Sequence, residues 1–112
     1  MATAKLVVMY PVPNDLAAFE QAYSIEHIPM AAAVFKKAGA TKAVLTKVID
    51  SPAGTSMFHR VAEIHFPSVA ALQACAESEA GRQALAHAHK ISNGGAPTIF
   101  VAEEDVVNLL HT

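Results

Sequence analysis

The sequence is short of several residues that stabilise or functionalise small proteins. It has one cysteine, no tryptophan and only 16% charged residues, whereas about 25% is usual in a globular domain. Cys75 has no second cysteine with which to form an internal disulfide, which is typical of a protein in the reducing cytoplasm. Because Cys75 stands in a helical pattern without a basic neighbour, we interpret it as a packing residue and not as a reactive thiol.

Long apolar runs and basic clusters are also missing from the sequence. No run approaches the ~20 apolar residues of a transmembrane helix, and no secretory signal is recognisable near the N-terminus. The formal net charge is −2, and the lysines and arginines are scattered. The sequence therefore predicts a protein that binds neither membranes nor nucleic acid.

What the sequence has instead is an excess of apolar residues for its size. Hydrophobic residues make up 53% of 112 positions, and this length corresponds to one domain, residues 1–112. A small monomer with so few polar side chains cannot cover its own surface with them. We therefore expect another subunit to cover part of that surface.

The order of predicted elements points to one α+β architecture. Asn14 or Asp15, Ser68 and Ser78 are predicted helix N-caps, Gly39 a helix stop, and Gly94-Gly95 a turn. Apolar patterns predict strands at 5–10, 41–49, 57–66 and 98–103, and helices at 15–39 with an interruption at Pro29, at 69–76 and at 79–91. The β-α-β-β-α-β order predicts a ferredoxin-like fold, a four-stranded antiparallel sheet with helices on one face.

Both faces of most predicted strands are apolar. In the first strand Leu6 and Val8 lie on one face, and Val7 and Met9 lie on the other. The strands at 41–49 and 98–103 also have two apolar faces, whereas the helices can cover only one face of the sheet. The sequence therefore predicts a homodimer in which two sheets pack face to face around a shared barrel.

The strand at 57–66 is the exception to this pattern. One of its faces is apolar except for Arg60, and the other has His59, Glu63 and His65 beside Val61. A polar line in an apolar chamber is either a hydrogen-bonded dimer contact or a ligand-binding site. The sequence leaves both interpretations open.

Tyr23 and His27 are the strongest candidates for chemistry. They follow Leu16 and Phe19 at helical spacing, which puts all four on one helix face toward the sheet. A histidine there is either a hydrogen-bonded core residue or, beside a phenol in an apolar cavity, a general acid or base. We expect Pro29 to break the helix just after His27 and to open space beside it.

Six histidines suggest a metal site, but their spacing argues against one. His87 and His89 are two residues apart on a predicted helix and point in nearly opposite directions. Their position in the last turns, where positive charge interacts favourably with the helix dipole, gives a simpler explanation. We therefore predict no bound metal.

Several motifs together resemble the EthD family, named for ethyl tert-butyl ether degradation, within the dimeric α+β barrel superfamily. The resemblance covers residues 5–103 and includes Tyr10-Pro11, Asp15, Phe19, Tyr23, Glu26-His27-Ile28-Pro29, Gly39, Arg60-Val61-Ala62-Glu63-Ile64-His65-Phe66, Ser78-Glu79 and Gly94-Gly95-Ala96-Pro97. It implies a ferredoxin-like protomer that dimerises through its sheet. Relatives in the superfamily include cofactor-free monooxygenases, cyclases of aromatic polyketides and muconolactone-isomerase-like enzymes.

The resemblance also suggests roles for individual residues. His27 matches the motif histidine, Tyr23 the aromatic residue before it, and Tyr10 the residue that ends the first strand. Where such proteins often have an acidic residue before the glycine-rich turn, this chain has His87-Ala88-His89-Lys90.

Three functional hypotheses follow. The first is an oxidoreductase, cyclase or isomerase that needs no cofactor and acts on a small hydrophobic or aromatic substrate. In it, His27 transfers a proton, Tyr23 and Tyr10 orient a substrate oxygen, and strand residues assist in substrate binding (Glu63, His65 and His59). The second is a non-catalytic accessory protein that binds a small hydrophobic ligand or a partner enzyme. The third is a dimeric module without a ligand site.

Overall fold

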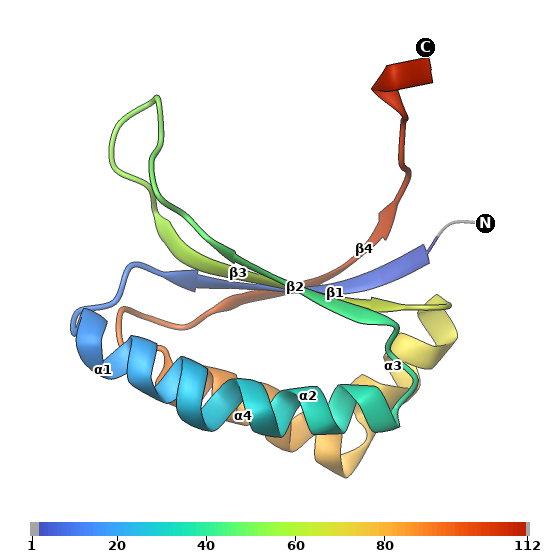
Figure 1. Cartoon of the computed structure of the whole chain (residues 1–112). Coiled ribbons are helices and arrows are strands. Elements are labelled where there is room, and N and C mark those ends of the chain that lie inside the picture. The colour runs from blue at the N-terminus through green and yellow to red at the C-terminus, as the bar shows by residue number, and fades with distance from the viewer. Residues whose placement is uncertain (1–2, 112) are drawn as a thin grey trace.

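The computed structural model describes residues 3–111, and its elements follow the predicted order (Figure 1). They are β1 (Thr3–Pro11), α1 (Leu16–Gln21), the π-helical turn η1 (Ala22–His27), α2 (Ile28–Lys37), β2 (Lys42–Lys47), β3 (Phe58–Phe66), α3 (Val69–Glu77), α4 (Glu79–Ile91), β4 (Thr98–Glu104) and the 3₁₀ turn η2 (Leu109–His111). The ferredoxin-like prediction is confirmed: four antiparallel strands form one sheet, and the helices lie on one of its faces.

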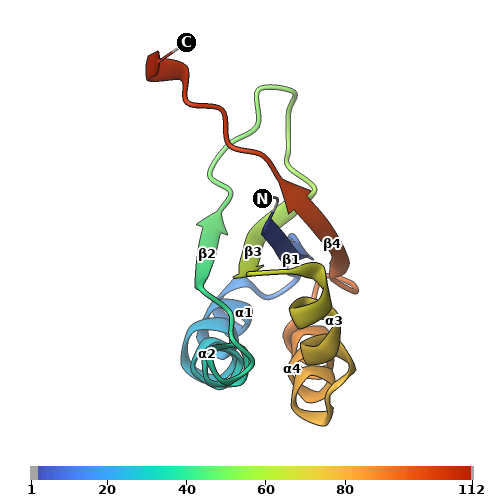
Figure 2. The same cartoon turned by 90° about the vertical axis from the view of Figure 1, so that its right-hand side faces the viewer.

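The sheet has the strand order β2-β3-β1-β4, so β1 and β3 are central and β2 and β4 are edges. Figure 2 shows two helical rods under the sheet, α1–α2 below the β2 side and α3–α4 below the β4 side. The strands differ from prediction at their ends. β2 is three residues shorter than expected and ends at Lys47, although the Val48 N–H still donates to the His59 carbonyl of β3.

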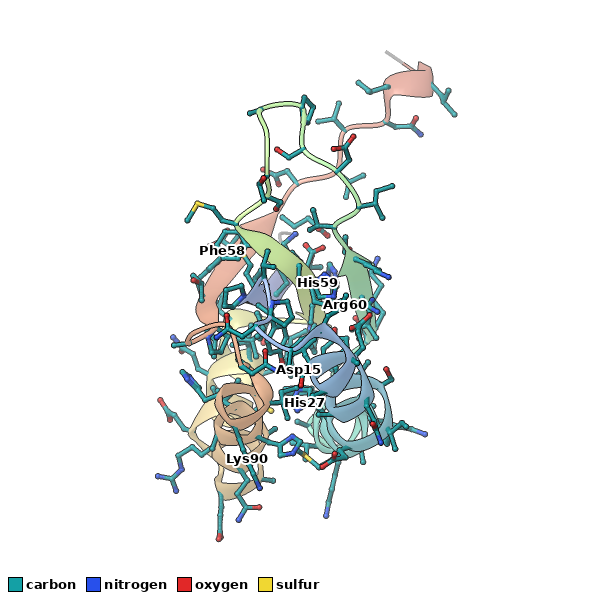
Figure 3. All side chains as sticks on the ribbon, turned by 90° about the vertical axis from the view of Figure 1, so that its left-hand side faces the viewer. Asp15, His27, Phe58, His59, Arg60 and Lys90 are labelled. Carbon is teal, nitrogen blue, oxygen red and sulfur yellow. The ribbon has the colours of Figure 1, made fainter. Side chains whose placement is uncertain are left out.

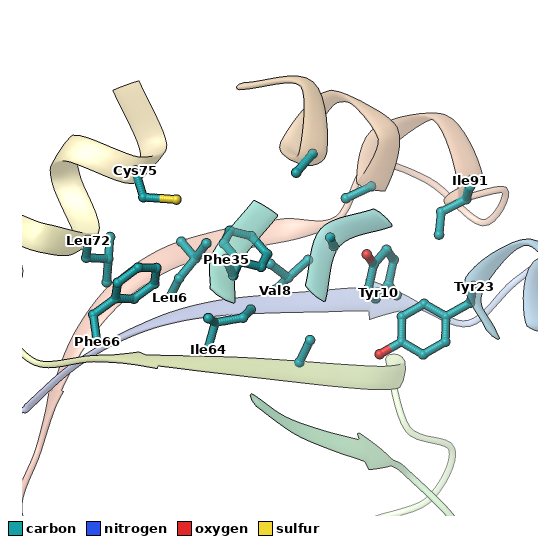
Figure 4. Close-up of a cluster of buried hydrophobic side chains, with 14 of the residues drawn as sticks. Leu6, Val8, Tyr10, Tyr23, Phe35, Ile64, Phe66, Leu72, Cys75 and Ile91 are labelled. Atoms are coloured by element: carbon teal, nitrogen blue, oxygen red, sulfur yellow. The ribbon is translucent and has the colours of Figure 1, made fainter. Parts of the chain in front are cut away.

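The hydrophobic core lies between the sheet and the helices. Phe35, Phe66, Leu72 and Cys75 pack at one end of it, and Tyr10 and Tyr23 at the other (Figure 4). Cys75 is buried, and this burial raises the pKa of its thiol. The interpretation of Cys75 as a packing residue is consistent with both observations.

Pro29 does not break its helix, so that prediction was wrong. The chain stays helical from Leu16 to Lys37, with η1 inserted just before the proline. In η1 the Ile28 N–H donates to the Tyr23 carbonyl, five residues back. Pro29 lies in the first turn of α2, where a missing N–H is tolerated. The wide π turn before it makes room for the proline ring.

The turn after α4 holds the ends of three elements together. The Asn93 side chain donates to the Asp15 carbonyl and accepts from the Asp15 N–H. A Cβ on Gly94 would lie 1.9 Å from the Val12 carbonyl oxygen, so this close approach requires glycine. The contacts fix the end of α4 against the end of β1 and the start of α1.

The sheet face away from the helices, here called the free face, is partly apolar and partly charged. Val44, Glu63, Val7 and Phe100 form one row across the four strands. Beside this row, Lys5 makes ion pairs with Glu63 and with Glu104, and Glu104 Oε1 lies 3.6 Å from His65 Nδ1. The β2–β3 loop and the segment after β4 both rise on this side (Figure 1).

Two predicted side-chain positions need correction. His59 is not in line with Glu63 and His65, because the β1–β3 register skips it: Tyr10 pairs with Arg60, and the next pair is Pro11 with Phe58. Such a bulge redirects the side chain, and the His59 ring lies 5.8 Å from that of Phe19. Leu16 is 53% exposed and therefore does not share the buried helix face.

Within the described residues, no helix is long and apolar enough to span a membrane.

The N-caps of α3 and α4 were predicted correctly, and the α4 cap gives a test of the fold. The Ser78 side chain accepts from the Gly81 N–H and donates to the Cys75 carbonyl. We expect Ser78→Ala to lower the free energy of unfolding by about 1 kcal/mol, or roughly 4–8 °C in Tm. The control Ser24→Ala removes an exposed hydroxyl from a helix interior and should cost much less. If urea denaturation shows the same decrease in the free energy of unfolding for both variants, the assigned role of the cap is contradicted.

Candidate active site

Four rings form a stacked column that joins the two helical rods. Phe19 and Tyr23 lie 5.4 Å apart, Tyr23 and His27 6.2 Å apart, and His27 and His87 5.2 Å apart, with interplanar angles of 12–17°. The first three come from α1 and η1 at four-residue spacing, and His87 comes from α4. His27 lies between the rods in Figure 3. The column therefore brings together side chains that are far apart in sequence.

Tyr10, at the end of β1, completes the group. Its ring meets Phe19, Tyr23 and His27 edge-on, at 5.2, 5.4 and 6.5 Å. The Tyr10 hydroxyl lies 3.4 Å from His27 Nε2, and His27 Nδ1 lies 2.9 Å from His87 Nδ1. Both nitrogens of the His27 ring thus have a partner.

The contacts of His27 select one placement of its proton. If the Tyr10 hydroxyl donates to Nε2, His27 must carry its hydrogen on Nδ1 and donate it to His87 Nδ1. The reverse placement would leave the buried Tyr10 O–H without an acceptor, which is unfavourable. We therefore assign the direction of donation as Tyr10 to His27 to His87.

The electrostatics of the site keep His27 neutral. Burial, and secondarily the proximity of His87, lowers the pKa of His27 to about 4. Burial also raises the pKa values of Tyr10 and Tyr23, so both phenols keep their protons at neutral pH. The result is a free-base imidazole that contacts the Tyr10 O–H and lies beside the Tyr23 ring, a combination suited to proton transfer.

A cavity of about 450 Å³ adjoins this group on the helix side of the sheet, within the usual range of small-molecule sites. Small side chains create it, because alanines occupy many positions on α2, α4 and the sheet. The lining residues are Val8, Tyr10, Tyr23, His27, Ile28, Ala31, Ala32, Phe35, Lys36, Ala40, Thr41, Lys42, Ala43, Leu45, Ala62, Ile64, Ala84, Leu85 and Ala88.

The Tyr23 hydroxyl is buried and, within residues 3–111, has no hydrogen-bond partner. Such a group is costly unless something satisfies it, and Tyr23 lines the cavity. The Arg60 guanidinium lies 5.2 Å above the Tyr23 ring and is held there by two hydrogen bonds to Glu20. A ligand oxygen is the group that would complete this arrangement.

The structure brings some of the predicted site residues together and separates others. Tyr10, Tyr23 and His27 converge at the end of the cavity. Glu63 and His65 lie on the free face, on the other side of the sheet, and His59 lies beside Glu20, with His59 Nε2 3.5 Å from Glu20 Oε2. A substrate-binding role for Glu63, His65 and His59 stays a prediction, and the cavity does not include them.

His87 is the site residue that the sequence interpretation missed. It was assigned to the helix dipole, whereas its ring stacks on that of His27. A signal was available, because Ala84, Ala88 and Ile91 form the buried face of α4 and His87 lies next to them on the helix surface. Among the residues that the structure describes, no three His, Cys, Asp or Glu side chains are grouped so that they could hold a metal ion.

The low pKa of His27 gives a prediction for pH dependence. The unfolded chain protonates His27 near its ordinary value of 6.5, and the folded chain does so only near 4. The unfolded state therefore binds more protons between these values, so this contribution to stability is complete above pH 6.5 and declines as the pH falls toward 4.

An NMR titration of the histidine rings should show His27 still neutral at pH 5. A His27→Asn variant should lose less stability than the native chain between pH 6.5 and 4. A His27 midpoint near 6.5 would contradict the assigned environment.

With the geometry established, comparison with known proteins identifies the relatives. Residues 15–102 match the family model described as "Domain of unknown function (DUF1330)". No curated protein matches the chain. An EthD family protein from Bacillus halodurans C-125 has a similar structure, with a TM-score of 0.83 and 26% identity over 92% of this chain and 99% of that one.

Two further solved structures share the fold at lower identity. A dimeric ferredoxin-like protein of unknown function from Jannaschia sp. CCS1 has a TM-score of 0.70 and 19% identity, over 93% of this chain and 99% of its own. SnoaB, a cofactor-independent oxygenase from Streptomyces nogalater, has a TM-score of 0.64 and 14% identity, over 98% of each chain. These likenesses confirm the resemblance that the motifs indicated: the chain belongs to the DUF1330 family and is related in structure to EthD family proteins.

Proposed function

We propose that this protein is an enzyme that removes and returns a proton on a small apolar compound bearing a carbonyl or phenol oxygen. One observation carries the proposal: the neutral, buried His27 and Tyr23, whose buried hydroxyl has no hydrogen-bond partner within the described residues, both line the same apolar cavity. His27 Nε2 is the base, and Tyr23 donates to the substrate oxygen on which negative charge develops. The Tyr10 hydroxyl lies 3.4 Å from Nε2, and this long contact breaks when substrate enters.

The proton transfer permits several reactions on the substrate carbanion. Return of the proton to another carbon is an isomerisation, and attack of the carbanion on an internal carbonyl is a cyclisation. Transfer of its electrons to molecular oxygen would make the protein an oxidoreductase that needs no bound cofactor. SnoaB, described as a cofactor-independent oxygenase, shows that this fold can serve such chemistry. We propose a location in the cytoplasm, as the lone cysteine suggests.

An accessory protein that stores or delivers an apolar ligand is the second candidate. It is favoured by the fact that both nitrogens of His27 already have protein partners and that the cavity walls are largely apolar. In this case the cavity binds the ligand and leaves it unchanged.

We also propose that the free face is the interface of a homodimer. It presents apolar side chains that the helices cannot cover, including Phe100, which is 43% exposed. The segment after β4 rises on the same side and has exposed apolar side chains at Val106, Val107, Leu109 and Leu110 (Figure 1). The Jannaschia protein is described as dimeric. In the dimer, Lys5, Glu63, His65 and Glu104 form a polar contact inside the interface.

The enzyme proposal is tested with 2-tetralone, a compact apolar ketone with acidic protons next to its carbonyl. We expect the protein to accelerate exchange of these protons with D2O above the rate in protein-free buffer, as followed by proton NMR. His27→Asn should reduce the protein-dependent rate by about 10²-fold or more, because the base is lost. Tyr23→Phe should reduce it less, because one donor to the oxygen is lost.

His89→Asn is the matched control, since His89 is exposed and does not line the cavity. Its exchange rate should equal that of the native chain. Binding of 2-tetralone, seen as chemical-shift changes at cavity alanines, without accelerated exchange would favour the accessory function. An unchanged rate in His27→Asn would remove the assigned role of His27.

The dimer proposal predicts a mass of twice 11.8 kDa by sedimentation equilibrium at micromolar concentration. Phe100→Glu should shift the protein to monomer, because it replaces an apolar side chain of the proposed interface with a charge that has no partner there. Leu16→Glu makes the same change at an exposed apolar position on the helix layer and should leave the dimer intact. A native chain that sediments as a monomer would refute the interface.

A further inference from the structure

His87 has a contact that the acid–base proposal does not use. Its Nδ1 lies 2.9 Å from His27 Nδ1, and the two rings are nearly parallel at 12°. Two neutral imidazoles in this arrangement share a single hydrogen between two nitrogens, one donating and one accepting. The hydrogen can move from His27 to His87 with both rings staying neutral only if His27 gains a hydrogen at Nε2 and His87 loses one at Nε2.

The other nitrogen of His87 reaches solvent. His87 is half-buried, whereas His27 is buried. In the described part of the chain, the buried side-chain polar atoms without a hydrogen-bond partner are Tyr23 Oη and His59 Nε2, and His87 Nε2 is not among them. The pair therefore extends from the cavity to the surface of α4.

We infer that His27 and His87 form a proton relay through which the cavity exchanges protons with solvent. The inference rests on the proposed function for its chemistry and adds a residue and a route to it. His87 does not touch the substrate, so it is a relay residue and not a second catalytic base.

Each step of the relay balances. The substrate C–H gives its proton to His27 Nε2, and the His27 Nδ1–H passes to His87 Nδ1. His87 then releases its Nε2–H to water, which leaves both rings neutral with their hydrogens on the opposite nitrogens. The reverse sequence brings a solvent proton to His87 Nε2 and delivers the His27 Nε2–H to the product carbanion, which restores the first state.

The relay solves a problem that burial creates. A buried imidazole that accepts a proton becomes a cation in an apolar environment, which is unfavourable. Transfer of the second hydrogen to His87 removes that charge from the cavity. Without His87, the proton would stay on His27 and return to the carbon from which it came.

The first experiment does not depend on substrate. In protein with ¹⁵N-labelled histidine at pH 7.5, nitrogen chemical shifts should show His27 with its hydrogen on Nδ1 and His87 with its hydrogen on Nε2. His87→Ala should shift the His27 Nδ1 resonance, because the Nδ1–H loses its acceptor, whereas His89→Ala should leave it unchanged. Finding native His27 with its hydrogen on Nε2 and His87 with its hydrogen on Nε2 would overturn the relay.

The second experiment separates proton transfer from positioning. In His87→Asn the side-chain oxygen can accept the Nδ1–H of His27 and orient the ring, but it cannot pass a proton on. We expect His87→Ala and His87→Asn both to lose tenfold or more of the 2-tetralone exchange rate in D2O. Added imidazole should restore exchange in His87→Ala, where it fills the vacated space, and not in His87→Asn.

The outcomes are distinguishable. Native exchange in His87→Asn would overturn the relay and leave His87 as a positioning residue. Native exchange in both variants would overturn any role for His87, while His27 could still be the base. If the native protein fails to exchange 2-tetralone, the proposed function fails for this probe, and the nitrogen shifts still decide whether the hydrogen is shared as the relay requires. Unfolding curves of the variants identify any loss of fold.

Discussion

The contact between His27 and His87 is the interaction on which the rest of the site depends. It joins the two helical rods across the helix layer, and it lies where the cavity ends. The stacked column holds the His27 ring from two sides, and Tyr10 closes the third. A ring restrained in this way keeps its orientation when a ligand binds and loses no further conformational freedom. A catalytic group held like this is preorganised.

The geometry of the column follows from a conflict between Pro29 and the helix. A proline removes a hydrogen bond and crowds the carbonyl one turn before it, so an ordinary α-helix would kink or end here. The chain instead widens into η1 immediately before Pro29 and remains helical. Residues four apart in the wider turn lie nearly above one another, and Tyr23 and His27 stack at 17°. The motif Glu26-His27-Ile28-Pro29 is therefore a structural unit, in which the proline positions the histidine.

The sequence predicted the fold almost completely and the site only in part, and the difference has a physical basis. The order of elements along the chain, the helix caps and the glycine turn depend on local signals, such as Ser68, Ser78 and the apolar run at 5–10, that act within a few residues. The His27–His87 contact spans 60 residues and depends on how α4 is rotated, which a short amphipathic pattern does not determine. His59 was misplaced for a similar reason, because a single bulge between β1 and β3 reversed its direction.

The identity of residue 87 also bears on what kind of base His27 is. The motifs that resemble EthD proteins often include an acidic residue near this point of the chain, and a carboxylate against His27 Nδ1 would stabilise the imidazolium and raise the pKa of the histidine. His87 does the opposite, since it helps to lower that pKa. A carboxylate partner favours a reaction in which the base holds a proton as a cation through the rest of the cycle. A second imidazole favours one in which the proton leaves quickly and another returns by the same path. With His87 as the partner of His27, the site that we propose conducts a proton and does not store one.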